Sequence, residues 1–125
     1  MKARLYGTRV FVRDFDAAVK FYQETLGLGV LFSDGGMGWA EFDTGDAHLC
    51  LQRTDRGDPE ADGLVGRFVG VSLQVDDIAA TYDELTGAGV AFEAPPETQT
   101  WGGVLAHFRD PEGNVLTLLG SPAAD

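Results

Sequence analysis

Hydrophobic and polar residues alternate along this chain with two different periods, and the order of the periods repeats. Residues 5–12 alternate with the period of two that is typical of a β-strand, and residues 15–26 carry apolar side chains at helical spacing. Asp14 stands at the N-cap position of this helix and Gly27 follows its end. Three further strands are predicted in the first half, at about 29–33, 38–43 and 47–53.

The second half repeats this order. A strand is predicted over residues 69–75, Asp77 is a second N-cap, and the helix of residues 78–89 again ends in glycine. Strands follow at about 90–93, 104–109 and 114–119. The stretch VFVRDFDAA matches SLQVDDIAA, and AEFDTGDAHLCL matches AHFRDPEGNVLTL. We therefore predict two βαβββ modules within one α+β domain: the first spans residues 1–53, the second 67–125, and an acidic linker, 54–66, joins them.

Each module has one helix, which covers one face of its sheet, so the other face must be buried elsewhere or line a cavity. Alternation places a mixed set of side chains on that other face: Gly7, Arg9, Phe11, Trp39, Glu41, Asp43, His48, Cys50, Gln52, Gly70, Ser72, Gln74, Leu105, His107, Arg109, Val115, Thr117 and Leu119. The set is too polar for a simple core. It predicts a concave, ligand-lined surface, and two such sheets facing each other would enclose a cleft.

The charge of the chain narrows the class of ligand. Nine Lys and Arg residues stand against twenty Asp and Glu residues, which gives a formal net charge of −11. Nucleic acids and anionic membranes attract basic patches, so we expect neither as a partner. An acidic surface favours the encounter with cationic small molecules, although solubility alone also explains such a charge.

The single cysteine, Cys50, cannot form an intramolecular disulfide, which suggests a reducing compartment. We find no signal-peptide pattern at the start of the sequence, and the apolar runs are too short to cross a bilayer. A cytoplasmic protein is therefore expected.

Two motifs give the chain a family resemblance. V-x-D-F-D-A-A-V-K-F-Y-x-x-x-L-G-L covers residues 12–28, and W-G-…-F-R-D-P-E-G-N covers residues 101–114. With the paired modules, they make nearly the whole chain resemble the vicinal oxygen chelate superfamily, which includes glyoxalase I, ring-cleaving dioxygenases and bleomycin-resistance proteins. The resemblance implies a glyoxalase/bleomycin-resistance-like cleft. It does not by itself fix a function, because this fold hosts many chemistries.

The resemblance also implies where a metal would bind. Enzymes of the superfamily hold a divalent metal with four side chains, usually His, Gln or Glu, on the first and last strands of each module. The matching positions here are Gly7, Cys50, Gly70 and Thr117. Glycine offers no donor, a threonine hydroxyl is a poor ligand, and one thiolate cannot hold a catalytic metal alone. We therefore expect neither metal nor another cofactor.

If the protein is nevertheless an enzyme, Glu41 and His107 are the candidate catalytic pair, because they occupy equivalent positions in the two modules and could exchange a proton. A rim location with ordinary hydrogen bonds is the simpler reading of both residues. His48 could replace a missing metal ligand, although its match in the second module, Val115, argues against this. Cys50 is most simply a small buried thiol.

The two tryptophans bear most on ligand binding. Trp39 should point into the cleft, and Trp101 precedes Gly102-Gly103 at its mouth, where the bleomycin-resistance branch forms an aromatic wall. An aromatic wall stacks on flat conjugated ligands, and both tryptophans could instead be structural, which is the favoured reading for Trp39. The residues predicted to line the ligand site are Arg9, Phe11, Trp39, Glu41, His48, Cys50, Trp101, Gly102, His107 and Thr117.

Two functional hypotheses follow. The first is a protein without catalytic activity that binds and sequesters an antibiotic or a similar aromatic, cationic natural product, as a homodimer that could exchange modules. The alternative is a lyase, isomerase or dioxygenase of the vicinal oxygen chelate type, either metal-free or with displaced ligands. The identity of the four metal-ligand positions favours the first hypothesis.

Overall fold

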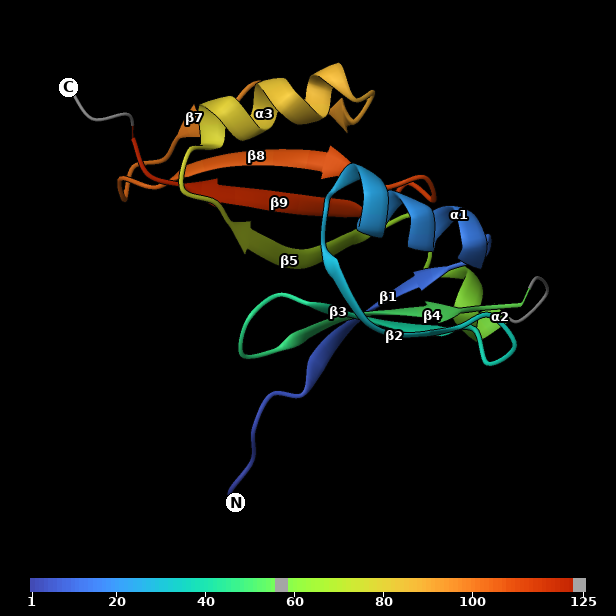
Figure 1. The fold of residues 1–125 in the computed structure, drawn as a ribbon. Coiled ribbons are helices and arrows are strands. Elements are labelled where there is room, and N and C mark those ends of the chain that lie inside the picture. The colour runs from blue at the N-terminus through green and yellow to red at the C-terminus, as the bar shows by residue number, and fades with distance from the viewer. Residues whose placement is uncertain (56–58, 123–125) are drawn as a thin grey trace. The chain divides into compact units, whose positions relative to one another are not determined.

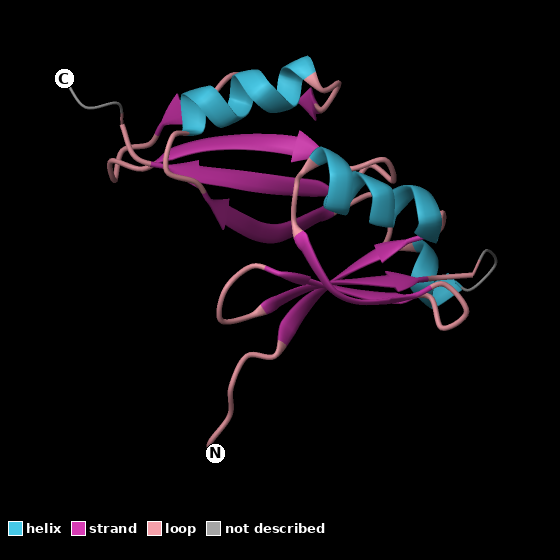
Figure 2. Cartoon of the chain, viewed as in Figure 1, coloured by secondary structure: helices cyan, strands magenta, loops and turns pink. Residues whose placement is uncertain are grey.

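The computed structural model describes residues 1–55 and 59–122 of the chain. These residues divide into two units, Met1–Arg67 and Phe68–Asp125, and each unit is a sheet with a helix along it (Figure 2). The predicted linker, 54–66, includes residues 56–58, which lie outside the described part. The last residues of the second predicted module, 123–125, also lie outside it.

The first unit is a four-stranded sheet with one long helical stretch (Figure 1). Its strands are β1 (Gly7–Val12), β2 (Gly29–Asp34), β3 (Trp39–Asp43) and β4 (His48–Arg53), arranged in the order β1-β4-β3-β2. The first and last strands pair in parallel, whereas the other neighbours are antiparallel. The helical stretch consists of α1 (Phe15–Lys20) and a π-helical segment, η1 (Phe21–Thr25).

The second unit repeats this arrangement. Its strands are β5 (Phe68–Gln74), β6 (Ala91–Phe92), β7 (Glu97–Thr98), β8 (Val104–Arg109) and β9 (Val115–Gly120), and its helix is α3 (Ile78–Gly87). The order is β5-β9-β8-β6, with β7 also paired to β8 and with β5 parallel to β9. Figure 1 shows α3 lying along β8 and β9. The α+β class and the two βαβββ modules are therefore confirmed.

The same local signals begin both helices. The carboxylate of Asp14 accepts a hydrogen bond from the N–H of Ala17 at 3.1 Å, and Asp77 accepts one from Ala80 at 3.0 Å. Gly27 follows the first helical stretch with a φ of +74°, a left-handed conformation that glycine adopts without strain. Both N-caps and the first helix end thus lie where the sequence predicts them.

Alternation along the strands separates a buried face from a mixed face in both sheets. The side chains toward the helices form the core, and the largest fully buried ones are Tyr22, Phe42, Leu49, Leu51, Phe108 and Leu116. Burial of each such side chain contributes about 1.5–3 kcal/mol.

The structure corrects several predicted boundaries. The first strand begins at Gly7 rather than at residue 5, and the predicted strand 90–93 is reduced to Ala91–Phe92. A short helix, α2 (Pro59–Asp62), lies within the predicted linker, and its Asp62 pairs with Arg13 at 3.0 Å. Neither α2 nor β7 was predicted. Both are too short to produce a periodic pattern.

The turn between β8 and β9 is held by a buried carboxylate. Asp110 is 5% exposed and accepts hydrogen bonds from the backbone N–H groups of Glu112 and Asn114, both at 2.9 Å. The side-chain amide of Asn114, which is fully buried, donates a third bond at 3.0 Å. This turn sets the start of β9 and thereby the position of Thr117.

Within the described residues, the helices are all too short or too polar to span a lipid bilayer.

Candidate functional site

The strand registers of the first unit place nine residues in a three-by-three array on the face away from the helix. Across β1, β4 and β3, the rows are Gly7, His48, Asp43; Arg9, Cys50, Glu41; and Phe11, Gln52, Trp39. Side chains in one row lie about 5 Å from their neighbours. A cation, Arg9, and an anion, Glu41, therefore flank the central thiol.

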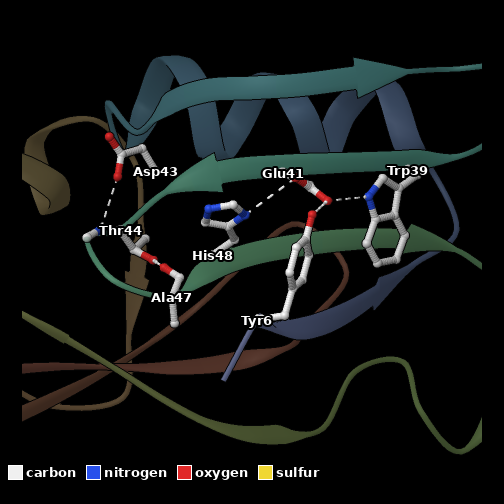
Figure 3. Close-up of polar contacts among 8 residues, drawn as sticks. Tyr6, Trp39, Glu41, Asp43, Thr44, Ala47 and His48 are labelled. Carbon is white, nitrogen blue, oxygen red and sulfur yellow. Dashed lines mark hydrogen bonds and ion pairs between the residues drawn. The ribbon is translucent and has the colours of Figure 1, made fainter. Parts of the chain in front are cut away.

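Glu41 is the centre of a polar cluster (Figure 3). Its Oε1 accepts a hydrogen bond from the phenol of Tyr6 at 2.5 Å and another from the indole N–H of Trp39 at 3.1 Å. Its Oε2 lies 3.4 Å from Nδ1 of His48. The side chain is 14% exposed, so two ring donors and an imidazole surround a carboxylate that water reaches only in part.

These contacts keep Glu41 ionised. The hydrogen bond from Tyr6 lowers the pKa of the carboxyl most, the bond from Trp39 lowers it further, and His48 adds to the effect, while burial opposes all three. The same contact raises the pKa of the Tyr6 phenol, because the bond favours its protonated form. At neutral pH the cluster is an anion held by a neutral phenol.

His48 leaves one atom of the cluster unsatisfied. Its Nδ1 is buried and lacks a hydrogen-bond partner of good geometry within the described chain, although it lies 3.4 Å from Oε2 of Glu41 and helps to lower the pKa of that carboxyl. The imidazole meets the ring of Tyr6 edge-on, with centroids 5.1 Å apart. Nδ1 of His48 and Oε2 of Glu41 are thus two neighbouring polar atoms that lack a shared donor.

Cys50 sits between Arg9 and Glu41 and is 1% exposed. Burial raises the pKa of its thiol, the charge of Glu41 raises it further, and Arg9 partly offsets both. The thiol is therefore protonated at neutral pH. Arg9 itself lies over the ring of Phe11 and donates a hydrogen bond to Gln52 at 3.1 Å, so its guanidinium is directed away from the cysteine.

The mixed face of the second unit centres on Thr117. Its Oγ1 lies 2.8 Å from Nδ1 of His107, and the His107 ring meets Phe68 edge-on. Arg109, two residues after His107 on the same strand, forms an ion pair with Glu93 at 3.2 Å. Thr117 is 3% exposed, which makes its hydroxyl a buried partner of the imidazole rather than an open ligand.

The four positions that would bind a metal in related enzymes do not fit one here. A Cβ at Gly7 would lie 2.7 Å from the carbonyl oxygen of His48, and Gly70 has a φ of +72°, so both positions disfavour any side chain. Cys50 is a protonated thiol and Thr117 is already paired with His107. Among the described residues no three His, Cys, Asp or Glu side chains gather as a metal would require. The donor set therefore does not suit a divalent metal.

Trp101 lies in the loop before β8 with 65% of its surface exposed. Its ring stands against Gly103, where a Cβ would come within 2.0 Å of it, and Gly102 has a φ of +96°. The two glycines therefore fix an indole that faces solvent.

The structure brings together some of the predicted site residues. Arg9, Phe11, Trp39, Glu41, His48 and Cys50 share the array of the first unit, and His107 pairs with Thr117 in the second. The hydrogen bonds and ion pair of Glu41 go to residues of its own unit, and the polar partner of His107 is Thr117, so the predicted Glu41–His107 pair stays a prediction. Tyr6 was missed, because alternation from a strand starting at residue 5 places it on the helix side.

Two sheets of equivalent order, each with a helical stretch after its first strand and a parallel pair of first and last strands, define the class of paired βαβββ proteins. The chain belongs to the Glyoxalase/Bleomycin resistance protein/Dioxygenase superfamily, whose sequence profile matches residues 4–118. The predicted resemblance is thereby confirmed.

Relatives within the superfamily include antibiotic-binding proteins. A bleomycin resistance protein of Klebsiella pneumoniae is 35% identical over 114 residues, covering 86% of this chain and 84% of its own. TnmS3, an antibiotic binding protein from Streptomyces sp. CB03234, is 31% identical with a TM-score of 0.77, covering 96% of this chain and 97% of its own. The bleomycin resistance determinant encoded on the transposon Tn5 is 31% identical with a TM-score of 0.71, covering 97% and 100%. A lactoylglutathione lyase from Agrobacterium tumefaciens, at 22% identity and a TM-score of 0.76, shares the fold.

Proposed function

We propose that this protein binds an aromatic natural product of the antibiotic type and sequesters it without altering it. The guest binds on the mixed face of a sheet, such as that of Trp39, Glu41 and His48 in the first unit, and in the second unit the exposed indole of Trp101 offers a stacking surface. The relatives with 31–35% identity support this function, because their names describe antibiotic resistance or antibiotic binding.

One observation favours sequestration over the activity of a metal-dependent enzyme of the same fold. The positions Gly7 and Gly70 have backbones that disfavour any side chain, so the first strand of each unit lacks its ligand. The two remaining positions hold a protonated thiol and a paired hydroxyl. A guest that is bound rather than transformed requires none of these ligands.

We further propose that the protein acts as a homodimer. The edge strand β2 exposes three consecutive apolar side chains, those of Val30, Leu31 and Phe32. Exposed apolar edge strands favour association with another copy. Sedimentation equilibrium at micromolar concentration should give twice the monomer mass, and a monomer at every concentration would contradict this assignment.

Native mass spectrometry of the purified protein tests the function directly. The protein is incubated with a panel of aromatic antibiotics that includes bleomycin, with and without prior chelator treatment. The expected result is a complex with a guest of unchanged mass in both samples. A guest of changed mass, or binding that is lost after chelation, would identify an enzyme instead.

The variant Trp101→Ala tests the stacking surface. Loss of the indole should weaken an aromatic guest about tenfold, since stacking contributes about 0.5–1.5 kcal/mol beyond the apolar area that the ring buries. Because Trp101 is largely exposed, the melting temperature should stay within about 2 °C of the parent. An unchanged dissociation constant would remove Trp101 from the site.

A further inference from the structure

The cluster around Glu41 has the properties of a cation subsite. The basic side chain within ion-pair distance of the carboxylate in the described chain is His48, at 3.4 Å, and Arg9, on the same row, is two strands away. The guanidinium of Arg9 bonds to Gln52 and lies over the ring of Phe11. Among the described residues, no Lys or Arg therefore forms an ion pair with Glu41.

The rings around this carboxylate hold it in its charged form. Tyr6, Trp39 and His48 border it on three sides (Figure 3). Tyr6 donates its O–H and Trp39 its indole N–H, and both bonds favour the anion. Both donors bond to Oε1, and within the described chain Oε2 has the imidazole of His48 as its polar neighbour.

One unsatisfied nitrogen and the carboxylate oxygen beside it specify the kind of cation. Nδ1 of His48 is buried and lacks a hydrogen bond within the described chain, and Oε2 of Glu41 lies 3.4 Å from it. One group with at least two N–H donors can bridge both atoms, whereas a quaternary ammonium has no N–H to donate. A primary ammonium fits this requirement.

Tyr6 determines access to the two atoms. It precedes β1 and lies outside the sheet ladder, its side chain is largely exposed, and its phenol covers Glu41 while its ring edge meets His48. A side chain held by one hydrogen bond can rotate away at modest cost, because such a bond to a charged group contributes about 1.5–3 kcal/mol.

We propose that Glu41, His48 and Trp39 form a subsite for a primary ammonium group of the guest, and that Tyr6 closes this subsite when it is empty. The assignment rests on the proposed sequestration function and gives the class of guest: an aromatic molecule that carries a primary amine. The ammonium displaces the phenol from Glu41, donates to Oε2 and Nδ1, and lies against the indole of Trp39.

The experiment follows the indole N–H signal of Trp39 by NMR during titration at neutral pH. The probes are benzylammonium chloride and its uncharged counterpart, benzyl alcohol. Benzylammonium should shift the signal along a saturable curve, and benzyl alcohol at equal concentration should leave it in place. Equal shifts from both probes, or none from benzylammonium, would overturn the proposal without any variant.

Three variants locate the effect. Glu41→Gln keeps an acceptor for Tyr6 and Trp39 but removes the charge, and should weaken benzylammonium at least tenfold. Asp83→Asn removes a charge from the exposed side of α3, and its affinity should stay within twofold of the parent. Tyr6→Phe removes the competing hydrogen bond, so affinity should rise severalfold. An equal loss in the Glu41 and Asp83 variants, or weaker binding by Tyr6→Phe, would contradict the assignment.

The outcome separates this inference from the proposed function. If an aromatic antibiotic is retained in native mass spectrometry while benzylammonium leaves Trp39 unshifted, sequestration stands and the subsite is wrong. If benzylammonium binds as described while no antibiotic in the panel is retained, the subsite stands and sequestration is wrong.

Discussion

The turn between β8 and β9 depends on one buried carboxylate, and Asp110→Ala should therefore destabilise the chain strongly. Asp110 accepts three hydrogen bonds, two from backbone N–H groups and one from the amide of Asn114. A hydrogen bond to a charged group contributes about 1.5–3 kcal/mol, and truncation leaves the buried donors unpaired. The three bonds share one acceptor, so their sum overstates the loss. We expect the free energy of unfolding to fall by about 3–4 kcal/mol, which is the range found when one partner of a buried ion pair is removed.

The assay is urea unfolding followed by tryptophan fluorescence, supported by thermal melting. For a domain of this size, 1 kcal/mol corresponds to about 3–5 °C, so the melting temperature should fall by about 10–15 °C. Asn114→Ala should cost about 1–2 kcal/mol, and the double variant should cost little more than Asp110→Ala alone. Asp83→Ala, on the exposed side of α3, should change stability by less than about 0.5 kcal/mol.

A different result would refute this account of the turn. If Asp110→Ala cost less than about 1 kcal/mol at an unchanged m-value, water would replace the three bonds without loss. If the effects of the two single variants added in full, Asp110 and Asn114 would act independently despite the 3.0 Å bond between them.

Three further predictions concern the first unit. Gly7→Ala should lower stability by about 1–3 kcal/mol, because its Cβ would meet the His48 carbonyl at 2.7 Å; an unchanged melting temperature would show that the strand shifts freely. Cys50 should react slowly with iodoacetamide at neutral pH, since burial and Glu41 raise the pKa of its thiol, and rapid labelling of the folded protein would contradict this burial. The pKa of Glu41 is lowered on folding, so its stabilising contribution is present above the ordinary glutamate range and disappears as the pH falls through the lowered value. In an NMR titration, Tyr6→Phe should move the Glu41 midpoint upward, and an unmoved midpoint would show that the phenol has no effect on it.

Much of the fold follows from local sequence signals. Asp14 and Asp77 cap helices because a short carboxylate side chain before a helical run can accept the free N–H groups of the first turn. The period of two predicted which residues of β1, β3 and β8 face the helix side, and the register then places Glu41 beside Cys50 on the other face. The parallel pairs β1–β4 and β5–β9 were not predicted, because no local pattern specifies which strands pair.

The composition of the site was only partly accessible from the sequence. Alternation applies inside a strand, but Tyr6 precedes the first paired residue, so its side chain is not held to either face. Its contact with Glu41, 35 residues away, depends on the path of the chain before β1. A periodic sequence pattern does not predict that path. His48 was considered as a metal ligand, whereas its distance to Glu41 became apparent only from the register of β3 and β4.

The parallel pairing of β1 with β4 has a consequence for biosynthesis. Gly7 pairs with His48, so about forty residues must leave the ribosome before the first strand meets its partner. The adjacent strands β2 and β3 are close in sequence and can pair much earlier, because short loops close at lower entropic cost. During translation, the nascent first unit therefore carries a β2–β3 hairpin beside an unpaired β1 whose Val10 and Val12 are not yet covered. This interval is when the chain is most exposed to chaperones and to aggregation.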